Sequence, residues 1–277
     1  MSDGSAKLSG DVGRLKHWGG EAVAFVTGQA WRNLTDNFRD QTRARETFRT
    51  LRGLRRVLPK RLFDLFLEKL TSVSWPYILT DHGFGRSLSS FDRGELWQKL
   101  EPALALFRAR GFEVVLTGGA LLTLWRDGRL QKYDDDLDIV LYRRGATIEE
   151  VAREHSNLPR SFSELDWSVR HSESSFHNQF SLGDTLPGVD VFPIWDVDSE
   201  DVFVYAAGVL PRDAVFPVSS FLDSDQVIPF PQDPPRLLEL FYGDWRTPDN
   251  VFKFDWTAAV RKGHLAEYHA LLGTFRK

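Results

Sequence analysis

Between residues 21 and 70 the apolar side chains recur at three- and four-residue steps, which is the period of an amphipathic helix. The clearest run consists of Leu51, Leu54, Val57, Leu58, Leu62, Leu65, Phe66 and Leu70. Pro59 interrupts the run, because proline lacks the amide hydrogen that an inner helical turn requires. We therefore expect two or three helices here. Residues 1–20, rich in Gly, Ser and Asp, are expected to be disordered.

Helical and strand patterns alternate in the middle of the chain. Asp92 with Glu95, and Thr147 with Glu150, have the spacing of a capping box, which marks the start of a helix. Short apolar runs between such helices predict buried strands. The expected elements are a helix from Asp92 to Gly111, a strand over 112–116, a helix over 120–126, a strand over 137–142 and a helix from Thr147.

Beyond Ser161 the period changes to two, which is typical of half-buried strands. The strands are expected over residues 165–170, 175–182, 188–194 and 201–206. Asp233, followed by two prolines, predicts the start of a helix that ends at Gly243, and a helical tail is expected from about Thr257.

Residues 71–92 are interpreted as a loop-rich connector. Within it, Gly83-Phe84-Gly85 is rejected as a dinucleotide-binding loop, because the third glycine is missing and no predicted strand precedes it. The fold class expected is α+β, with a mixed β-sheet flanked by helices and a helical N-terminal extension. The predicted parts are disordered residues 1–20, a basic helical region and connector over 21–92, and one domain over 93–277.

The composition is that of an ordinary globular protein. The chain has 277 residues and a formal charge of -4, and 42 % of its residues are hydrophobic. Its 21 Phe and 9 Trp exclude disorder over most of the length. The absence of cysteine excludes disulfides, thiolate catalysis and cysteine-type zinc fingers. An apolar run of about 20 residues and a signal-peptide pattern are both missing, so a cytoplasmic protein is expected.

Charge is unevenly distributed along the chain. Between Arg43 and Arg61 there are eight basic side chains and one acidic side chain, Glu46. One interpretation is a helical extension whose arginines are simply solvated. The other is a basic surface at residues 43–61 that contacts anionic lipid at the inner face of the membrane, or a polyanionic glycan. The mild overall acidity argues against nucleic acid as a partner.

Four aspartates stand at the start of the strand predicted over 137–142. They are Asp134, Asp135, Asp136 and Asp138. Residues two apart in a strand point to the same face, so Asp136 and Asp138 are expected to project together, with Asp135 on the alternate face. Two adjacent carboxylates repel each other unless a cation lies between them. Such a pair suits a hard divalent cation, Mg²⁺ or Mn²⁺.

A glycine pair and a further acid complete this candidate site. Gly118 and Gly119 lie where a strand leads into a helix, and the free amides of a helix start bind anions such as phosphate. Asp190 is a single acid in an otherwise apolar run, where an uncompensated charge would be costly. Together these features predict phosphoryl or nucleotidyl transfer. His171 and His177 are interpreted as ordinary polar positions, and no zinc site is expected.

Four motifs follow one another in a fixed order. They are the helix from Gly119 to Arg126, the block Asp134-Asp135-Asp136-Leu137-Asp138, the strand Val189-Asp190-Val191-Phe192-Pro193, and Tyr242-Gly243-Asp244-Trp245 followed by Pro248. This set resembles the LicD/fukutin family of phosphotransferases over roughly residues 94–250. The chain departs from the family where it has Gly119-Ala120-Leu121-Leu122-Thr123 in place of Gly-Thr-Leu-Leu-Gly.

The resemblance implies a nucleotidyltransferase-like fold and a metal-dependent transfer. The donor would be a CDP-linked alcohol carrying phosphocholine, ribitol phosphate or glycerol phosphate. The acceptor would be a hydroxyl of a cell-surface or lipid-linked glycan. Asp136 and Asp138 would hold Mg²⁺ or Mn²⁺, and Asp190 would act as general base or as a third metal ligand.

Other residues receive supporting roles from the same resemblance. Gly118, Gly119, Arg126 and Lys132 would bind the donor phosphates, with Arg129 near them. Asp134 would assist the metal ligands without binding the ion itself. Tyr242, Asp244 and Trp245 either end a helix with a packed Trp or line the donor or acceptor site.

Two other functions remain open at this point. The same fold and carboxylates suit a nucleotidyltransferase that moves NMP from an NTP to a small molecule or sugar. A non-catalytic scaffold that binds glycan or lipid through its basic N-terminal helices is the second alternative.

Overall fold

The computed structural model describes residues 75–80, 83–162, 167–171, 177–181, 186–205, 208–248 and 264–275. The chain divides into two compact units, residues 1–85 and 86–277, and we describe each by itself. The disorder expected over residues 1–20, the helices expected over 21–70 and the basic surface at 43–61 lie outside the described residues. A separate domain over 93–277 stays a prediction.

The predicted connector over residues 71–92 is not simply a loop. It contains strands β1 (Tyr77–Thr80) and β2 (Gly83–Arg86), which form a two-stranded sheet. A short 3-10 helix, Leu88–Ser90, follows. Aromatic and β-branched side chains such as Tyr77 and Ile78 favour the strand, but the segment is too short to show a period.

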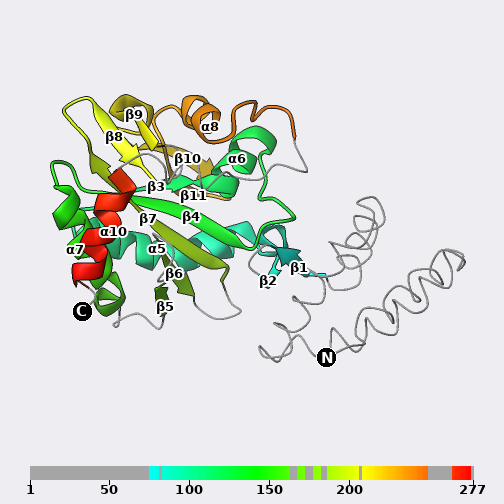
Figure 1. Cartoon of the computed structure of the whole chain (residues 1–277). Coiled ribbons are helices and arrows are strands. Elements are labelled where there is room, and N and C mark those ends of the chain that lie inside the picture. The colour runs from blue at the N-terminus through cyan, green and yellow to red at the C-terminus, as the bar shows by residue number, and fades with distance from the viewer. Residues whose placement is uncertain are drawn as a thin grey trace, which may run out of the picture. The chain divides into compact units, whose positions relative to one another are not determined.

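A mixed sheet forms the centre of the second unit, as the sequence predicts (Figure 1). Seven strands of the described chain belong to it: β3 (Glu113–Thr117), β4 (Asp136–Tyr142), β5 (Ser168–His171), β6 (Asn178–Ser181), β7 (Gly188–Asp196), β8 (Asp201–Val204) and β9 (Gly208–Pro211). The main path runs β3-β4-β7-β6-β5. Among the described strands of this sheet, the pairing of β4 with β7 is parallel and the others are antiparallel.

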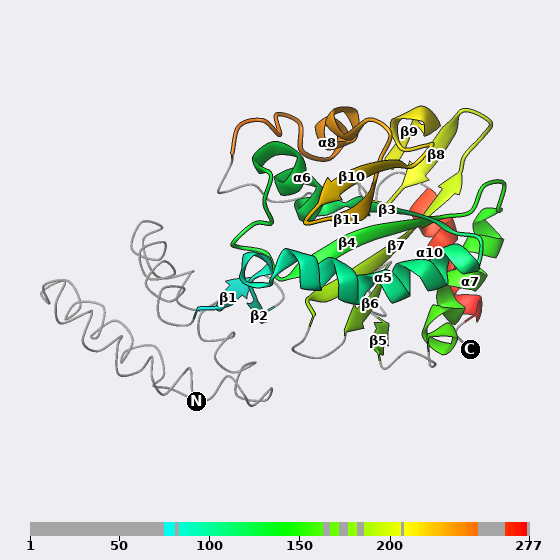
Figure 2. The ribbon, with the colours of Figure 1, turned by 180° about the vertical axis from the view of Figure 1, so that it is seen from behind.

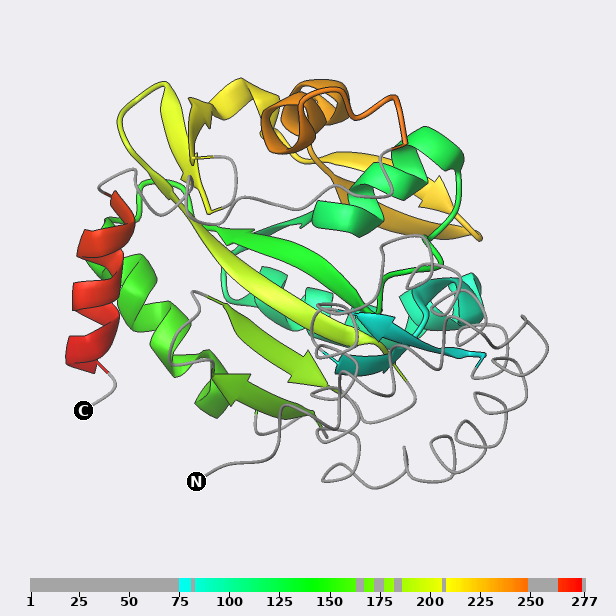
Figure 3. The same ribbon diagram turned by 45° about the vertical axis from the view of Figure 1, so that its right-hand side comes forward.

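Strand β7 changes its partner on one edge. Along its other edge it pairs with β4 over Gly188–Ile194. On the edge opposite to β4, Val189–Val191 pair with β6 and Ile194–Asp196 pair with β8 (Figure 3). The change falls at Phe192 and Pro193, where proline has no amide hydrogen to donate to a neighbouring strand. The sheet is therefore forked at this point.

The helices pack on the sheet as their apolar positions predict. They are α5 (Arg93–Ala109), α6 (Gly118–Asp127), α7 (Ile148–Ser161), α8 (Pro234–Tyr242) and α10 (His264–Phe275). Helix α5 lies across one face of the sheet (Figure 2). Helix α7 packs against β7 and carries α10, whereas α6 packs against β3 and β4. No described helix combines the length and apolar character of a membrane span.

The predicted helix starts are confirmed in detail. The side chain of Asp92 accepts a hydrogen bond from the amide of Glu95 at 2.9 Å. Thr147 and Glu150 form a reciprocal capping box at the start of α7. Asp233 caps α8 in the same manner, accepting from the amide of Arg236.

One hairpin of the second unit was not predicted. Strands β10 (Ser219–Asp223) and β11 (Gln226–Phe230) pair through a turn at Ser224 and Asp225. Both turn residues have positive φ, 50° and 62°, the geometry that suits a two-residue hairpin but usually calls for Asn-Gly. Ser-Asp gives no such signal. Pro229 further weakens the strand pattern, since proline is rare within strands.

His155 of α7 connects three elements within the core. Its Nε2 atom donates to the carbonyl of Val191 on β7 at 3.0 Å, and its Nδ1 atom accepts from the hydroxyl of Tyr268 on α10 at 2.7 Å. The carbonyl of His155 accepts from the side-chain amide of Asn178 on β6 at 2.9 Å. These buried bonds attach α10 and α7 to strands β6 and β7.

Tyr268→Phe is expected to lower the free energy of unfolding by about 1–2 kcal/mol, because it leaves the buried Nδ1 atom of His155 without its donor. Urea unfolding of the full chain measures the change. Tyr133→Phe removes the same hydroxyl from a side chain that is 66 % exposed and serves as the control. Equal effects of the two substitutions would contradict the role given to this bond.

Candidate active site

The strand register brings three of the predicted acids to one face of the sheet. Asp136 and Asp138 lie two residues apart on β4 and share a face. Asp138 is paired with Asp190 on β7 and with Thr117 on β3, and paired residues also share a face. Asp136 and Asp190 are buried, and Asp138 is partly buried. We call Asp138 and Asp190, together with the Thr117 hydroxyl paired beside them, the acid row.

A tighter cluster forms just before β4. One carboxylate oxygen each of Asp134, Asp135 and Asp136 lies within 4.8 Å of the others. Sequence reasoning placed Asp135 on the alternate face by strand alternation, but the strand begins only at Asp136. Asp134 and Asp135 belong to the preceding turn, where alternation does not apply. We call Asp134–Asp136 the acid cluster.

The electrostatics of the acid cluster favour a bound cation. The pKa of Asp134 is raised, mainly because burial disfavours its charged form and also because the carboxylate of Asp136 repels it. The side-chain amide of Gln131 opposes this shift by donating to Asp134 at 2.5 Å. Close carboxylates in a buried position are stabilised by a divalent cation with a preference for oxygen ligands.

The glycine pair has a structural task that the sequence did not reveal. Gly118 has a φ of +63°, and a Cβ atom there would lie 1.8 Å from Oδ2 of Asp138. A Cβ atom on Gly119 would lie 2.4 Å from Oδ2 of Asp134. Both positions therefore need glycine because the carboxylates occupy the space. The start of α6 faces these negative groups, as its dipole favours. Phosphate binding at Gly118 and Gly119 stays a prediction.

Three predicted phosphate-binding cations have distinct surroundings. Arg126 donates from Nε and Nη2 to the carboxylate of Asp127, and from Nη1 to the carbonyl of Trp245 at 3.1 Å. It thereby ties α6 to the segment that follows α8. Lys132 is exposed, with its ammonium 5.6 Å from the ring centre of Tyr133, and Arg129 is also exposed. Their contact with donor phosphates stays a prediction.

The Tyr-Gly-Asp-Trp motif divides into two parts. Tyr242 ends α8, and its pKa is raised by burial and by the charges of Asp138 and Asp134, so it lies near the acid row. Trp245 is buried and its carbonyl is held by Arg126, while Asp244 is exposed. The motif therefore combines a packed Trp with a tyrosine beside the acids.

Two further residues of this site were missed. Nε2 of His177, which the sequence indicated as an ordinary polar position, lies 3.2 Å from Oδ2 of Asp190. Tyr205 follows β8 and stacks on Phe192 at 4.5 Å, and its pKa is raised by burial and by the charges of Asp190 and Asp138. Both residues lie at strand ends, where no sequence period indicates which way a side chain points.

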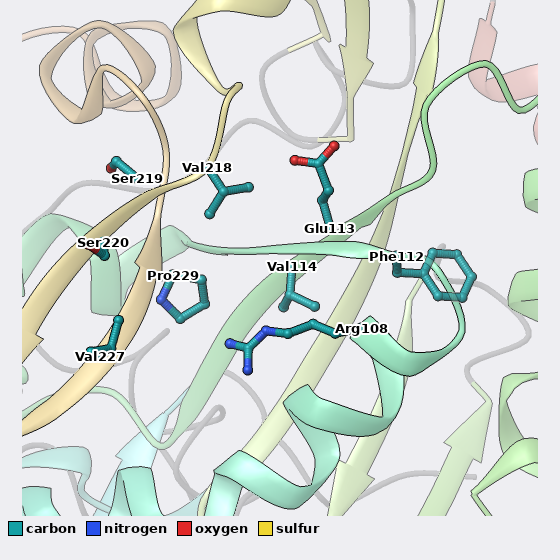
Figure 4. A pocket seen from close by; sticks show the side chains of 9 residues that line it. All are labelled: Arg108, Phe112, Glu113, Val114, Val218, Ser219, Ser220, Val227 and Pro229. Carbon is teal, nitrogen blue, oxygen red and sulfur yellow. The ribbon is translucent and has the colours of Figure 1, made fainter.

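A cavity of about 280 Å³ lies apart from these residues. It is bounded by the end of α5, the start of β3 and the β10–β11 hairpin, with Arg108, Val114 and Pro229 in its wall (Figure 4). None of the acids or glycines of the candidate site lines it. The cavity is therefore separate from the candidate site at the acids.

Two solved structures show a low similarity to this chain. The crystal structure of ANT(2")-Ia in complex with adenylyl-2"-tobramycin is 16 % identical over 65 % of this chain and 95 % of its own, with a TM-score of 0.38. The solution structure of antibiotic-resistance factor ANT(2")-Ia is 18 % identical over 65 % of this chain and 90 % of its own, with a TM-score of 0.32. No curated protein matches the sequence.

A family model gives a more direct relationship. Residues 111–233 match the model described as LicD/FKTN/FKRP, nucleotidyltransferase domain. The matched part includes the acid row, the acid cluster and the glycine pair. It ends at Asp233, before the Tyr-Gly-Asp-Trp motif. Residues 111–233 are therefore similar to the nucleotidyltransferase domain of LicD/fukutin proteins.

Proposed function

We propose that this chain is a transferase that moves a phospho-alcohol from a CDP-linked donor to a hydroxyl of a cell-surface or lipid-linked glycan. The phospho-alcohol would be phosphocholine, ribitol phosphate or glycerol phosphate. The observation that carries the proposal is the pairing of Asp138 with Asp190 beside the acid cluster. It unites a candidate cation site and a separate acid on one face of the sheet.

The donor atoms of the site fit Mg²⁺ or Mn²⁺. Carboxylate oxygens are the ligands these ions prefer, and the acid cluster offers three of them in one place. The buried hydroxyl of Thr117, next to Asp138, has no hydrogen-bond partner within the described residues. Asp136 and Asp138 would hold the ion, with Asp134 or Asp135 assisting. When bound, it would supply positive charge to the donor phosphates and to the departing CMP.

The remaining steps fall to the side chains of the chain. Asp190 would take the proton from the acceptor hydroxyl, whose oxygen then forms the new bond to the phosphorus next to the alcohol. The bond between that phosphorus and the bridging oxygen breaks, and CMP leaves with the electron pair. Tyr242, near Asp134 and Asp138, would line the donor side. Tyr205 and His177 would border the acceptor side beside Asp190.

Product analysis tests this function. The purified chain is incubated with CDP-choline, CDP-ribitol, CDP-glycerol and each NTP, with Mg²⁺ or Mn²⁺. Release of CMP from one CDP-alcohol is the expected result, with water in place of the glycan hydroxyl as the acceptor of the phospho-alcohol. The competing function is nucleotidyl transfer, which the description of the matching family favours. Release of pyrophosphate from an NTP, without CMP from any CDP-alcohol, would establish that function instead.

Removal of divalent cations with EDTA is expected to reduce CMP release to the background rate, and Mg²⁺ or Mn²⁺ should restore it. A second measurement does not depend on turnover. Mn²⁺ at 100 times its dissociation constant should stabilise the chain by about 2.7 kcal/mol. The same measurement with Ca²⁺ in place of Mn²⁺ compares the stabilisation by a larger ion. Full activity in EDTA would contradict the metal-dependent mechanism.

A membrane role for the basic residues 43–61 remains part of the proposal. They would hold the enzyme near a lipid-linked acceptor by attraction to anionic headgroups. Co-sedimentation with anionic and with neutral vesicles tests this contact, and equal binding to both would contradict it.

A further inference from the structure

His177 approaches Asp190 from the neighbouring strand. It directly precedes β6, in which Asn178 is paired with Val191 and Gln179 with Asp190. Extending this antiparallel register by one residue puts His177 opposite Phe192, on the face that carries Asp190. The ring centres of His177 and Phe192 are 5.1 Å apart, and Nε2 of His177 lies 3.2 Å from Oδ2 of Asp190.

The backbone on both sides of this contact is held by α7. Asn178, next to His177, is fully buried and donates its side-chain amide to the carbonyl of His155. Val191, next to Asp190, accepts from Nε2 of the same histidine. Asn178 and Val191 are thus both hydrogen-bonded to His155, on the face of the sheet opposite to the contact between His177 and Asp190. The strands cannot slide past each other there without breaking buried hydrogen bonds.

A carboxylate needs such a contact if its orientation is to be fixed. The torsion that turns the carboxylate of an aspartate is broad and has no sharp minimum. A hydrogen bond from Nε2 to Oδ2 selects one orientation, and Oδ1 is then directed in a defined way. The contact requires a hydrogen on Nε2, which the imidazolium and one neutral tautomer both carry. It therefore does not require a change in the charge of His177.

The two side chains of this contact differ in their exposure to solvent. The side chain of Asp190 is 6 % exposed, whereas that of His177 is 20 % exposed. The histidine thus lies on the outer side of the acid. It is separate from the acid cluster on β4, where the donor phosphates are placed by the proposed function.

We propose that His177 is a positioning residue, which holds the carboxylate of Asp190 in the orientation required to accept a proton from the acceptor. This inference rests on the proposed function, because it specifies how the base of that reaction is held. It assigns His177 a role in the proton-transfer step and none in binding the donor.

Steady-state kinetics of CMP release test the role. His177→Ala is expected to lower kcat on the order of 10- to 100-fold, with the KM for the donor changed by less than about twofold. His177→Gln, whose amide can donate to the same oxygen, should recover most of the lost rate. His269→Ala removes a histidine from α10 and serves as the matched control. A kcat of His177→Ala within about twofold of wild type would overturn the proposal, as would a His177→Gln variant no faster than His177→Ala.

A spectroscopic measurement separates this inference from the proposed function. Side-chain ¹H–¹⁵N spectra of the full chain, with His177 assigned through His177→Gln, are compared between wild type and Asp190→Asn. The Nε2 signal of His177 should shift, and unchanged signals would overturn the contact whatever the activity. If pyrophosphate is released from an NTP instead of CMP from a CDP-alcohol, the proposed function fails and the same variants are assayed on that NTP. A chain that turns over neither substrate overturns both proposals.

Discussion

An Asp138→Asn chain is expected to release CMP at least about 1,000-fold more slowly than the wild-type protein. Asp138 lies in the acid row between Thr117 and Asp190, and its carboxylate rests against Gly118. Asparagine keeps the size of the side chain but removes the charge, so the packing against α6 is retained while a cation ligand is lost. Turnover with the CDP-alcohol donor measures the rate, and Mn²⁺ titration measures the affinity.

The matched control for this change is Asp213→Asn. Asp213 is 77 % exposed and pairs with Arg236 on the surface, so the same loss of charge should leave turnover unchanged. If Asp138→Asn retained Mn²⁺ affinity and more than about a tenth of the wild-type rate, Asp138 would not be a metal ligand.

Gly118→Ala is expected to destabilise the fold by about 3 kcal/mol and to abolish turnover. Two independent penalties act at this position. The left-handed φ of +63° is unfavourable for alanine, and the new methyl group would lie 1.8 Å from Oδ2 of Asp138. Either the carboxylate or the start of α6 must move, and both belong to the candidate site. Urea unfolding and CMP release measure the two effects.

Gly128→Ala isolates the first penalty. Gly128 ends α6 with a φ of +65°, and a methyl group there would meet no atom within 4 Å. It should lower stability by about 1 kcal/mol, with turnover unchanged. The difference between the two variants measures the collision with Asp138. Equal losses of stability would show that the carboxylate does not occupy this space.

Much of the fold could be predicted, because most elements bury one side. The helices that begin at Asp92, Thr147 and Asp233 have a capping residue and a clear apolar period, and each was confirmed. Strands β4 and β7 form long apolar runs in the centre of the sheet. The hairpin β10–β11 and strand β9 were not predicted, because they are short and each alternates over only four or five residues.

The candidate site was predictable where it lies on regular strands. Alternation along β4 placed Asp136 and Asp138 on one face, although it could not show that Asp190 is paired with Asp138. The parallel pairing of β4 with β7 is a long-range property of the fold. Asp135 was given little weight, and His177 and Tyr205 were missed, for a common reason. They lie outside strands, in turns and at strand ends, where local sequence does not determine the direction of a side chain.

The fork in the sheet joins two kinds of structure that differ in their tolerance of sequence change. The strands that carry Asp138 and Asp190 are hydrogen-bonded along their lengths, so substitutions there disturb the whole sheet. His177 and Tyr205 instead stand at the open ends of β6 and β8, beside the position where β7 changes partner. Strand ends and the segments attached to them tolerate insertion and exchange. The segments attached to the fork are therefore expected to vary among related chains more than the paired strands that carry Asp138 and Asp190. His177 itself is expected to persist, because it contacts Asp190.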